Sequence, residues 1–174
     1  TSNVTAEDKD GNSISSITGT PNALSSGVPP TYVATSAGGS LTVAVDADTA
    51  KENILVAGSA DQAISKFKFT TTDKAFVVKK LSINNRQSAA TTAALGNYDN
   101  NVTSIKLSYK NSAGVVETKS GTLTNGTANF AGLDMLVAED SSAVLTVTAN
   151  LNTIAAGATA AEFVDLNVAF NDFE

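Results

Sequence analysis

The chain has 174 residues and a net charge of −6, and its eleven Lys and Arg residues are scattered along the sequence. Nucleic-acid binding requires clustered positive charge, so this distribution argues against it. Cysteine and histidine are both absent, which excludes disulfides, thiolate nucleophiles, Ser-His-Asp triads and zinc sites built from His or Cys.

The remaining composition favours an extracellular β protein. Hydrophobic residues make up 42% of the chain, which is enough for a core, but charged residues only 16%, below the usual quarter. Ser, Thr and Asn take the place of the missing charges, as they do in many extracellular β proteins. No apolar run approaches the roughly 18 residues that a membrane-spanning helix requires, so we expect no membrane span in this chain.

The N-terminal region predicts an arm in front of the main domain. Residues 4–17 indicate a hairpin whose turn is Asp10-Gly11, because glycine tolerates positive φ and aspartate tolerates it better than most residues. Glycines and prolines interrupt residues 19–40, which predicts a loop. Residues 31–35 are expected to form a short strand inside it.

Two further strands follow before the most regular part of the chain. Residues 41–46, LTVAVD, alternate between apolar and polar, and residues 53–57 predict a short apolar strand. The large apolar residues concentrate after residue 53. We therefore predict residues 1–52 to be an N-terminal arm or covering hairpin with a Gly/Pro-rich loop, and residues 53–174 to be the β-sandwich core.

The alternation is strongest in residues 61–83, DQAISKFKFTTTDKAFVVKKLSI, which predict two strands joined by a turn at residues 72–74. A period of two residues is typical of a half-buried strand and differs from the 3.6-residue period of a helix. The inward side chains of the first strand are expected to be Ala63, Ser65, Phe67, Phe69 and Thr71. The side chains expected to share one face of the second strand are Val77, Lys79, Leu81 and Ile83.

Residues 84–101 predict a long loop, and more strands follow it. The alternation in residues 103–110 places three large side chains inward, namely Ile105, Leu107 and Tyr109. A turn at residues 111–114 leads to a partner strand at residues 115–124. Asn125-Gly126 is the strongest hairpin signal in the chain and leads into residues 127–130. The pattern leaves open which structure residues 133–138 form.

The C-terminal part adds two strands. Residues 143–151 alternate, with Leu145 and Val147 inward, and a loop is expected at residues 152–161. Residues 163–173 form the last predicted strand, with a buried face made of Leu166, Val168 and Phe170. Many short strands, turn signals about every 8–12 residues and no long helix predict an all-β fold: a two-layer antiparallel β-sandwich, immunoglobulin-like or jelly-roll.

Two short motifs carry a resemblance to known surface proteins. The turn from Asp8 to Asn12, DKDGN, with the serine-rich strand after it, resembles the bacterial immunoglobulin-like repeats of surface proteins, which often carry a D-x-x-G-N turn. The stretch from Val56 to Asp61, leading into KFKF, is similar to modular β-sandwich domains of surface-layer and adhesin-like proteins. This resemblance implies a non-catalytic module of the cell surface and transfers no functional residue.

Residue pairs with catalytic chemistry are present, but their spacing and context argue against an enzyme. Ser65 and Lys68 match the S-x-x-K motif, yet side chains three residues apart on a strand point to opposite faces. Asp46 with Asp48, and the acidic pair at residues 139–140, have the groups needed for acid–base chemistry. Both pairs lie in turn-like sequence, where solvated acidic residues are common.

Calcium is the cofactor that the sequence leaves open. Asp8, Asp10 and Asn12 place oxygen-bearing side chains at alternating positions, which a hard cation favours. The position of the glycine and the missing glutamate exclude an EF-hand. A second group of the same residue types is Asn97, Asp99 and Asn101. Ordinary turn chemistry favours these residues as well and requires no metal.

Three acceptor sequons for N-glycosylation are present. Their asparagines are Asn3, Asn101 and Asn125, and each is followed two residues later by threonine. All three fall at predicted turns or element ends, where a glycan has room.

Together these patterns predict a non-catalytic structural subunit of an extracellular assembly, such as a filament, a pilus or a surface layer. Its expected partners are copies of itself, with other surface proteins or glycans as further candidates. We expect subunits to join by β-strand addition, in which residues 1–17 or residues 163–173 of one chain complete the sheet of the next. The alternative is an adhesive or ligand-binding module of a larger cell-surface protein.

Overall fold

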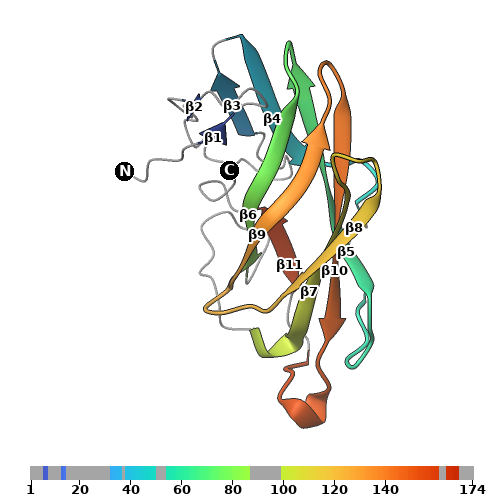
Figure 1. Cartoon of the computed structure of the whole chain (residues 1–174). Helices are drawn as coiled ribbons and strands as arrows, with labels where there is room; N and C mark the ends of the chain where they lie inside the picture. Colours follow the sequence, from blue (N-terminus) through green and yellow to red (C-terminus); the bar gives the residue numbers. More distant parts are fainter. Residues whose placement is uncertain are drawn as a thin grey trace.

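A computed structural model describes residues 6–7, 13–14, 32–36, 38–49, 54–86, 99–160 and 164–168 of the chain. In this part every strand pairing is antiparallel, and the helical segments are two short 3-10 turns, η1 (Asp99–Asn101) and η2 (Ile154–Ala156). Two sheets form the layers of a sandwich (Figure 1). The predicted all-β, two-layer antiparallel sandwich is therefore confirmed.

The larger layer is a six-stranded sheet with the order β3-β4-β5-β10-β7-β8. Its strands are β3 (Tyr32–Ser36), β4 (Gly39–Val45), β5 (Gln62–Thr72), β7 (Val102–Lys110), β8 (Val116–Gly121) and β10 (Ser142–Leu151). Five of these strands begin and end within two residues of their predicted positions, while β8 is shorter than residues 115–124. β5 and β10 pair at the centre of the sheet, with Phe67 opposite Leu145.

The smaller layer is a three-stranded sheet with the order β11-β6-β9. Its strands are β6 (Phe76–Arg86), β9 (Thr127–Val137) and β11 (Asp165–Val168). The undecided residues 133–138 thus lie mainly in the long strand β9. β11 pairs only with the end of β6, from Ile83 to Arg86, whereas β9 accompanies β6 from Phe76 to Asn84.

The N-terminal hairpin is present as a separate small sheet. β1 (Ala6–Glu7) pairs with β2 (Ser13–Ile14), as predicted, and β2 lies beside β3. The core of the sandwich begins earlier than the expected boundary at residue 53. β4 belongs to the six-stranded sheet, and its side chains Leu41 and Val43 are buried in the core.

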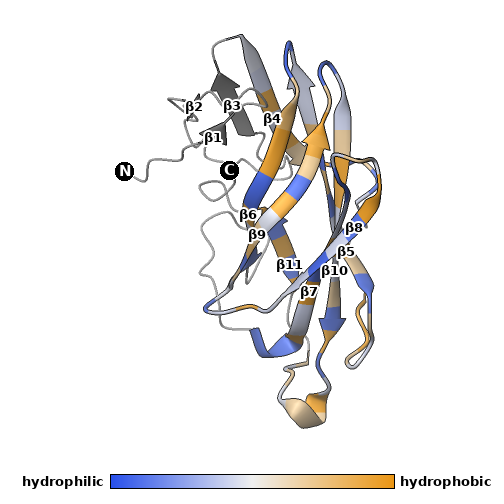
Figure 2. Cartoon of the chain, viewed as in Figure 1, coloured by the Kyte–Doolittle hydropathy of each residue, from blue (hydrophilic) through white to orange (hydrophobic). Residues whose placement is uncertain are grey.

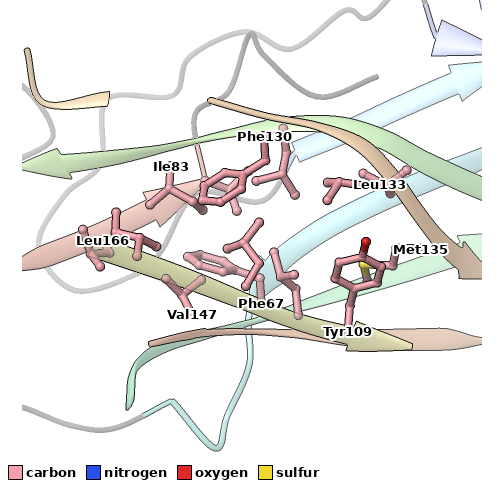
Figure 3. Packing of buried hydrophobic residues seen from close by; sticks show 14 of the residues in the cluster. Phe67, Ile83, Tyr109, Phe130, Leu133, Met135, Val147 and Leu166 are labelled. Atoms are coloured by element: carbon pink, nitrogen blue, oxygen red, sulfur yellow. The ribbon is translucent and has the colours of Figure 1, made fainter. Parts of the chain in front are cut away.

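The core consists of the inward side chains of both layers (Figure 3). On β5 the alternation is as predicted from Ser65 to Thr71, because Phe67 is 4% exposed and Phe69 fully buried while Lys68 is exposed. The expected inward position of Ala63 is wrong: this residue is exposed, since a register shift in the pairing with β10 lies between it and Ser65. The predicted inward sets of β7 and β10 are confirmed in the same way. Figure 3 shows Leu166 of β11 at one end of this packing and Tyr109 at the other.

The predicted inward face of residues 76–83 is wrong in its first half. A register shift between Val78 and Lys80 interrupts the pairing of β6 with β9. Such a bulge reverses the face to which the following side chains point. The buried side chains are Phe76 and Val78 before the shift and Leu81 and Ile83 after it.

The expected hairpin at Asn125-Gly126 is a turn between layers. Asn125 and Gly126 have φ values of 51° and 80°, so the turn chemistry was correctly predicted. The two flanking strands, however, belong to different sheets, and a single bridge between Thr124 and Thr127 joins them. The predicted strand at residues 53–57 is also wrong in its described part, because residues 54–57 are not in a strand.

The face assignment of β5 makes a direct prediction. Replacing Phe67 by Ala should lower the free energy of unfolding by about 3–5 kcal/mol, since it removes a buried ring from a packed core. Replacing its exposed neighbour Lys68 by Ala should change stability by no more than about 0.5 kcal/mol. Chemical denaturation followed by circular dichroism measures both values, and equal losses would contradict the assignment.

Candidate functional site

The predicted calcium site cannot be placed in the structure. Asp8, Asp10 and Asn12 lie outside the described residues, and so do Asn97 of the second group and the sequon residue Asn3. Calcium binding by the first group stays a prediction. Where side chains are described, no cluster of three or more acidic residues forms a metal-binding group.

Two members of the second group, Asp99 and Asn101, lie in η1 and hold neighbouring segments. The Oδ2 atom of Asp99 accepts a hydrogen bond from the Gly126 N–H at 2.8 Å. The Oδ1 atom of Asn101 accepts one from the Thr159 N–H at 2.7 Å. Both side chains thus have a structural function, because they fasten the turn between the layers and the segment after η2.

The sequons at Asn101 and Asn125 differ in accessibility. Asn101 is 7% exposed and its side chain is engaged within the fold, so a glycan on it would disrupt this packing. Asn125 is exposed at the tip of its turn. Of these two acceptors, the structure therefore favours Asn125.

The pairs with catalytic residue types lie in structural positions. Ser65 is buried and donates a hydrogen bond to the Leu166 carbonyl at 2.8 Å, while Lys68 is exposed on the opposite face of β5. Ser65 and Lys68 therefore cannot exchange a proton directly.

The first acidic pair, Asp46 and Asp48, lies in a turn. The Oδ1 atom of Asp46 accepts a hydrogen bond from the Asp48 N–H at 2.8 Å, which is a common turn arrangement.

The second acidic pair, at residues 139–140, is equally part of a turn. Asp140 has a φ of 48°, and its Oδ1 atom accepts a hydrogen bond from the Asp73 N–H at 2.9 Å. Asp73 itself has a φ of 65°. This contact ties the turn between β5 and β6 to the turn between β9 and β10.

A charged pair on β8 was missed by the sequence analysis. Glu117 and Lys119 stand opposite Tyr109 and Leu107 of β7, and directly opposite residues in a sheet share a face. The pair therefore points to the inner side of the sandwich, where its charged groups lie 2.9 Å apart. The charged hydrogen bond to Glu117 raises the pKa of Lys119 above its ordinary value.

Beside this pair, the hydroxyl of Tyr109 is buried and has no hydrogen-bond partner within the described part of the chain. Burial, and then the negative charge of Glu117, raise the pKa of Tyr109 above 10.0. Figure 3 shows the ring at the Met135 end of the core. Its tyrosinate form is thus disfavoured in the folded protein.

One end of the sandwich carries an unusual amount of exposed apolar surface. We define the apolar end as residues 54–60 together with residues 152–157. The two segments lie side by side, because the Gly58 N–H donates to the Asn152 carbonyl at 3.0 Å and the Leu151 N–H donates to the Ser59 carbonyl at 2.8 Å. Its prominent side chains are Ile54, Val56 and Ile154, which are 90%, 69% and 57% exposed.

The apolar end is also uncharged, since neither of its two segments contains Asp, Glu, Lys or Arg. Figure 2 shows the η2 region as a hydrophobic tip beyond the strands. Single exposed apolar side chains are normal on a protein surface, but a group of them marks an interaction site. The apolar end is therefore the most distinctive candidate site in the described structure.

Comparison with known protein families, curated proteins and solved structures finds no match to this chain. The resemblance to bacterial surface modules consequently stays a prediction based on short motifs. Within the described residues, no helix is long and apolar enough to cross a membrane.

The raised pKa values of Tyr109 and Lys119 predict a loss of stability at high pH. A group whose pKa is raised on folding stabilises the protein below its unfolded-state pKa and ceases to do so as pH rises through the folded-state pKa. For both groups this window begins near their ordinary values of 10.0 and 10.5. Thermal unfolding measured from pH 8 to about 11 should show a falling midpoint.

The variant Tyr109→Phe isolates the contribution of the tyrosine. Its stability at pH 7 should equal or exceed that of the wild type, because the lost hydroxyl has no described hydrogen-bond partner. Its alkaline loss should be smaller, since one of the two titrating groups is gone. An unchanged alkaline profile would show that the tyrosine does not contribute.

Proposed function

We propose that this protein is a non-catalytic structural subunit of an extracellular assembly, such as a filament, a pilus or a surface layer. The observation that carries the proposal is the uncharged apolar end with its three exposed aliphatic side chains. Low charge, the abundance of Ser, Thr and Asn, and the absence of Cys and His support an extracellular, non-enzymatic role. The partner we propose is a second copy of the chain.

A second copy fits because exposed apolar side chains also occur at the opposite end of the same sheet. Val115 and Val116 are 60% and 62% exposed, and Val116 pairs with Lys110 at the end of β7. The apolar end lies beyond Leu151, which is opposite Val102 at the start of β7. Contact between unlike ends is heterologous, and such contacts build open filaments when the rotation does not close a ring.

The apolar contact is too small to hold a filament together by itself. Burying each of the three side chains contributes roughly 1.5–3 kcal/mol. Association itself costs an estimated 4–15 kcal/mol, so the net affinity from this source is weak. A durable assembly therefore needs a second interaction, and strand addition supplies main-chain hydrogen bonds as well as apolar contacts.

The two sides of the sandwich differ in how they receive an added strand. On one side, the inward charges Glu117 and Lys119 protect the edge strand β8, which is a recognised way to block edge-to-edge pairing. A bridge between Asn111 and Met135 also joins the layers there. On the other side β11 is only four residues long and pairs with β6 only from Ile83 to Arg86. Within the described residues, the smaller sheet therefore has three strands beside Ile83 but only two, β6 and β9, beside Phe76.

We place strand addition on this second side, with residues 1–17 of another copy as the preferred added segment and residues 163–173 as the second choice. Inside one subunit β1 pairs with β2, and β2 lies next to β3, so the described part of the arm packs on its own subunit. Strand addition therefore requires the arm to leave that position. The Gly- and Pro-rich sequence between the arm and β3, with Gly19, Pro21, Gly27, Pro29 and Pro30, supports such an exchange.

The role of the apolar end is tested by a triple substitution, Ile54→Ser with Val56→Thr and Ile154→Ser. We expect concentration-dependent association, measured by sedimentation velocity, to be lost. The unfolding free energy should change by no more than about 0.5 kcal/mol per substitution, because these side chains are exposed. The control is Val144→Thr, an exposed apolar residue on a sheet face. Wild-type association of the triple variant would overturn the proposal.

Deletion of residues 1–17 tests the added strand. The truncated protein should fold, because the six-stranded sheet starts with β3 and the described core starts with Leu41 of β4, and it should polymerise more slowly or remain monomeric. Electron microscopy and light scattering measure the outcome. Rescue by a synthetic peptide of residues 1–17 would support strand addition, whereas polymerisation at normal rate and stability would rule out the arm as the link.

A further inference from the structure

The outward face of the six-stranded sheet carries a group of lysines. Lys66 and Lys68 lie on β5, and Lys106 and Lys110 lie on β7. Each alternates with a buried residue of its strand, such as Phe67 or Leu107, so the lysine side chains point away from the core. We call this surface the lysine face.

The lysine face lacks the acidic residues that usually accompany surface lysines. The outward positions of β5, β7, β8 and β10 contain Lys, Ser, Thr, Asn and aliphatic residues, but no Asp or Glu. Among the described acids, Asp61 and Asp46 border the face: Asp61 pairs with Lys106 at 2.5 Å, and the backbone of Asp46 lies beside that of Lys66. No described acidic side chain forms an ion pair with Lys68 or Lys110. In a chain of net charge −6, this is a marked separation of charge.

The sheet register arranges the lysines on both sides of β10, whose outward side chains there are the exposed Val144, opposite Lys68, and two threonines. β10 runs between β5 and β7, and its Thr146 stands opposite Lys66 on one side and Ser108 on the other. Thr148 stands opposite Lys106. Neighbouring strands lie about 4.8 Å apart, so the backbones of β5 and β7 are separated by roughly 10 Å across β10.

We propose that the lysine face binds an acidic polysaccharide. The ammonium groups match the regularly spaced carboxylates or sulfates of such a polymer, the Thr and Ser hydroxyls near them match its sugar hydroxyls, and the exposed Val144 offers an apolar surface to its C–H groups. A nucleic acid fits less well, because the outward positions of β5, β7, β8 and β10 carry no aromatic side chain on which bases could stack. The apolar end is a separate surface, so this proposal does not depend on the proposed assembly.

The experiment uses the full chain and two acidic polymers, polygalacturonate for carboxylates and chondroitin sulfate for sulfates. We expect binding to at least one of them, and weaker binding as salt rises, since released counterions drive such contacts. Neutral dextran should not bind. Absence of binding to both acidic polymers at low salt, or equal binding of dextran, would overturn the proposal.

A pair of matched double variants locates the site. Lys68→Gln with Lys110→Gln removes two charges from the lysine face, and Lys79→Gln with Lys80→Gln removes two from β6 in the other sheet. We expect the first to weaken binding by at least about tenfold, whereas the second retains most of the wild-type affinity. Circular dichroism and chemical denaturation confirm that both remain folded. Equal losses in the two variants would show non-specific charge attraction and overturn the site.

Two further outcomes separate other partners. If single-stranded DNA of equal charge displaces the polymer as effectively as the polymer itself, the face does not recognise sugars and the proposal fails. If Lys68→Gln with Lys110→Gln abolishes self-association without changing polymer binding, the face is an interface between copies, which also overturns it. Polymer binding that persists in the triple variant of the apolar end would support two independent surfaces.

Discussion

The structure depends on the packing of the β5 side chains Phe67 and Phe69 against the smaller sheet. β5 is paired along both edges, with β4 and with β10, so its inward face lies in the middle of the larger layer. No cysteine is available to link the layers, and burial of these side chains must therefore provide much of the free energy that holds them together. The same alternation sends Lys66 and Lys68 outward. Core and lysine face are thus two consequences of one sequence pattern.

Hydrogen bonds between distant segments assist this packing where polar groups are buried. The Ser65 hydroxyl donates to the Leu166 carbonyl and so joins β5 to β11 across the layers. The Thr71 hydroxyl donates to the Ala138 carbonyl at 2.5 Å, close to the turn that Asp140 fastens. Buried polar groups without partners are costly, and bonds of this kind remove that cost while fixing the positions of loops.

Strands in which apolar and polar residues alternate regularly could be predicted from the sequence, whereas features that depend on distant residues could not. β5, β7 and β10 alternate so regularly that their inward faces were correctly assigned, with the exception of Ala63 at the start of β5. The bulge in β6 arises from its pairing with β9, which a local pattern cannot reveal. Likewise, Asn125-Gly126 identified the turn through its φ requirement, but the sheet of each flanking strand is decided by long-range pairing.

The candidate sites were predicted less well for a related reason. Apolar sequence at residues 54–57 indicated a buried strand, because composition does not distinguish an exposed aliphatic side chain from a buried one. Alternation in β8 leaves open which set points inward, and the structure places the charged set there. Asp99 and Asn101 had the residue types of a metal site, but their hydrogen bonds to Gly126 and Thr159 are visible only in the folded chain.

The distribution of charge determines where copies of this protein can approach each other. A net charge of −6 makes copies repel, and this repulsion is weakest where a surface carries no charge of its own. The apolar end meets that condition and lies beyond the ends of the strands, while the lysine face lies on the side of the sheet. Association along the strand direction therefore leaves most of the lysine face open, and of its four lysines Lys110 lies beside the proposed contact, opposite Val116.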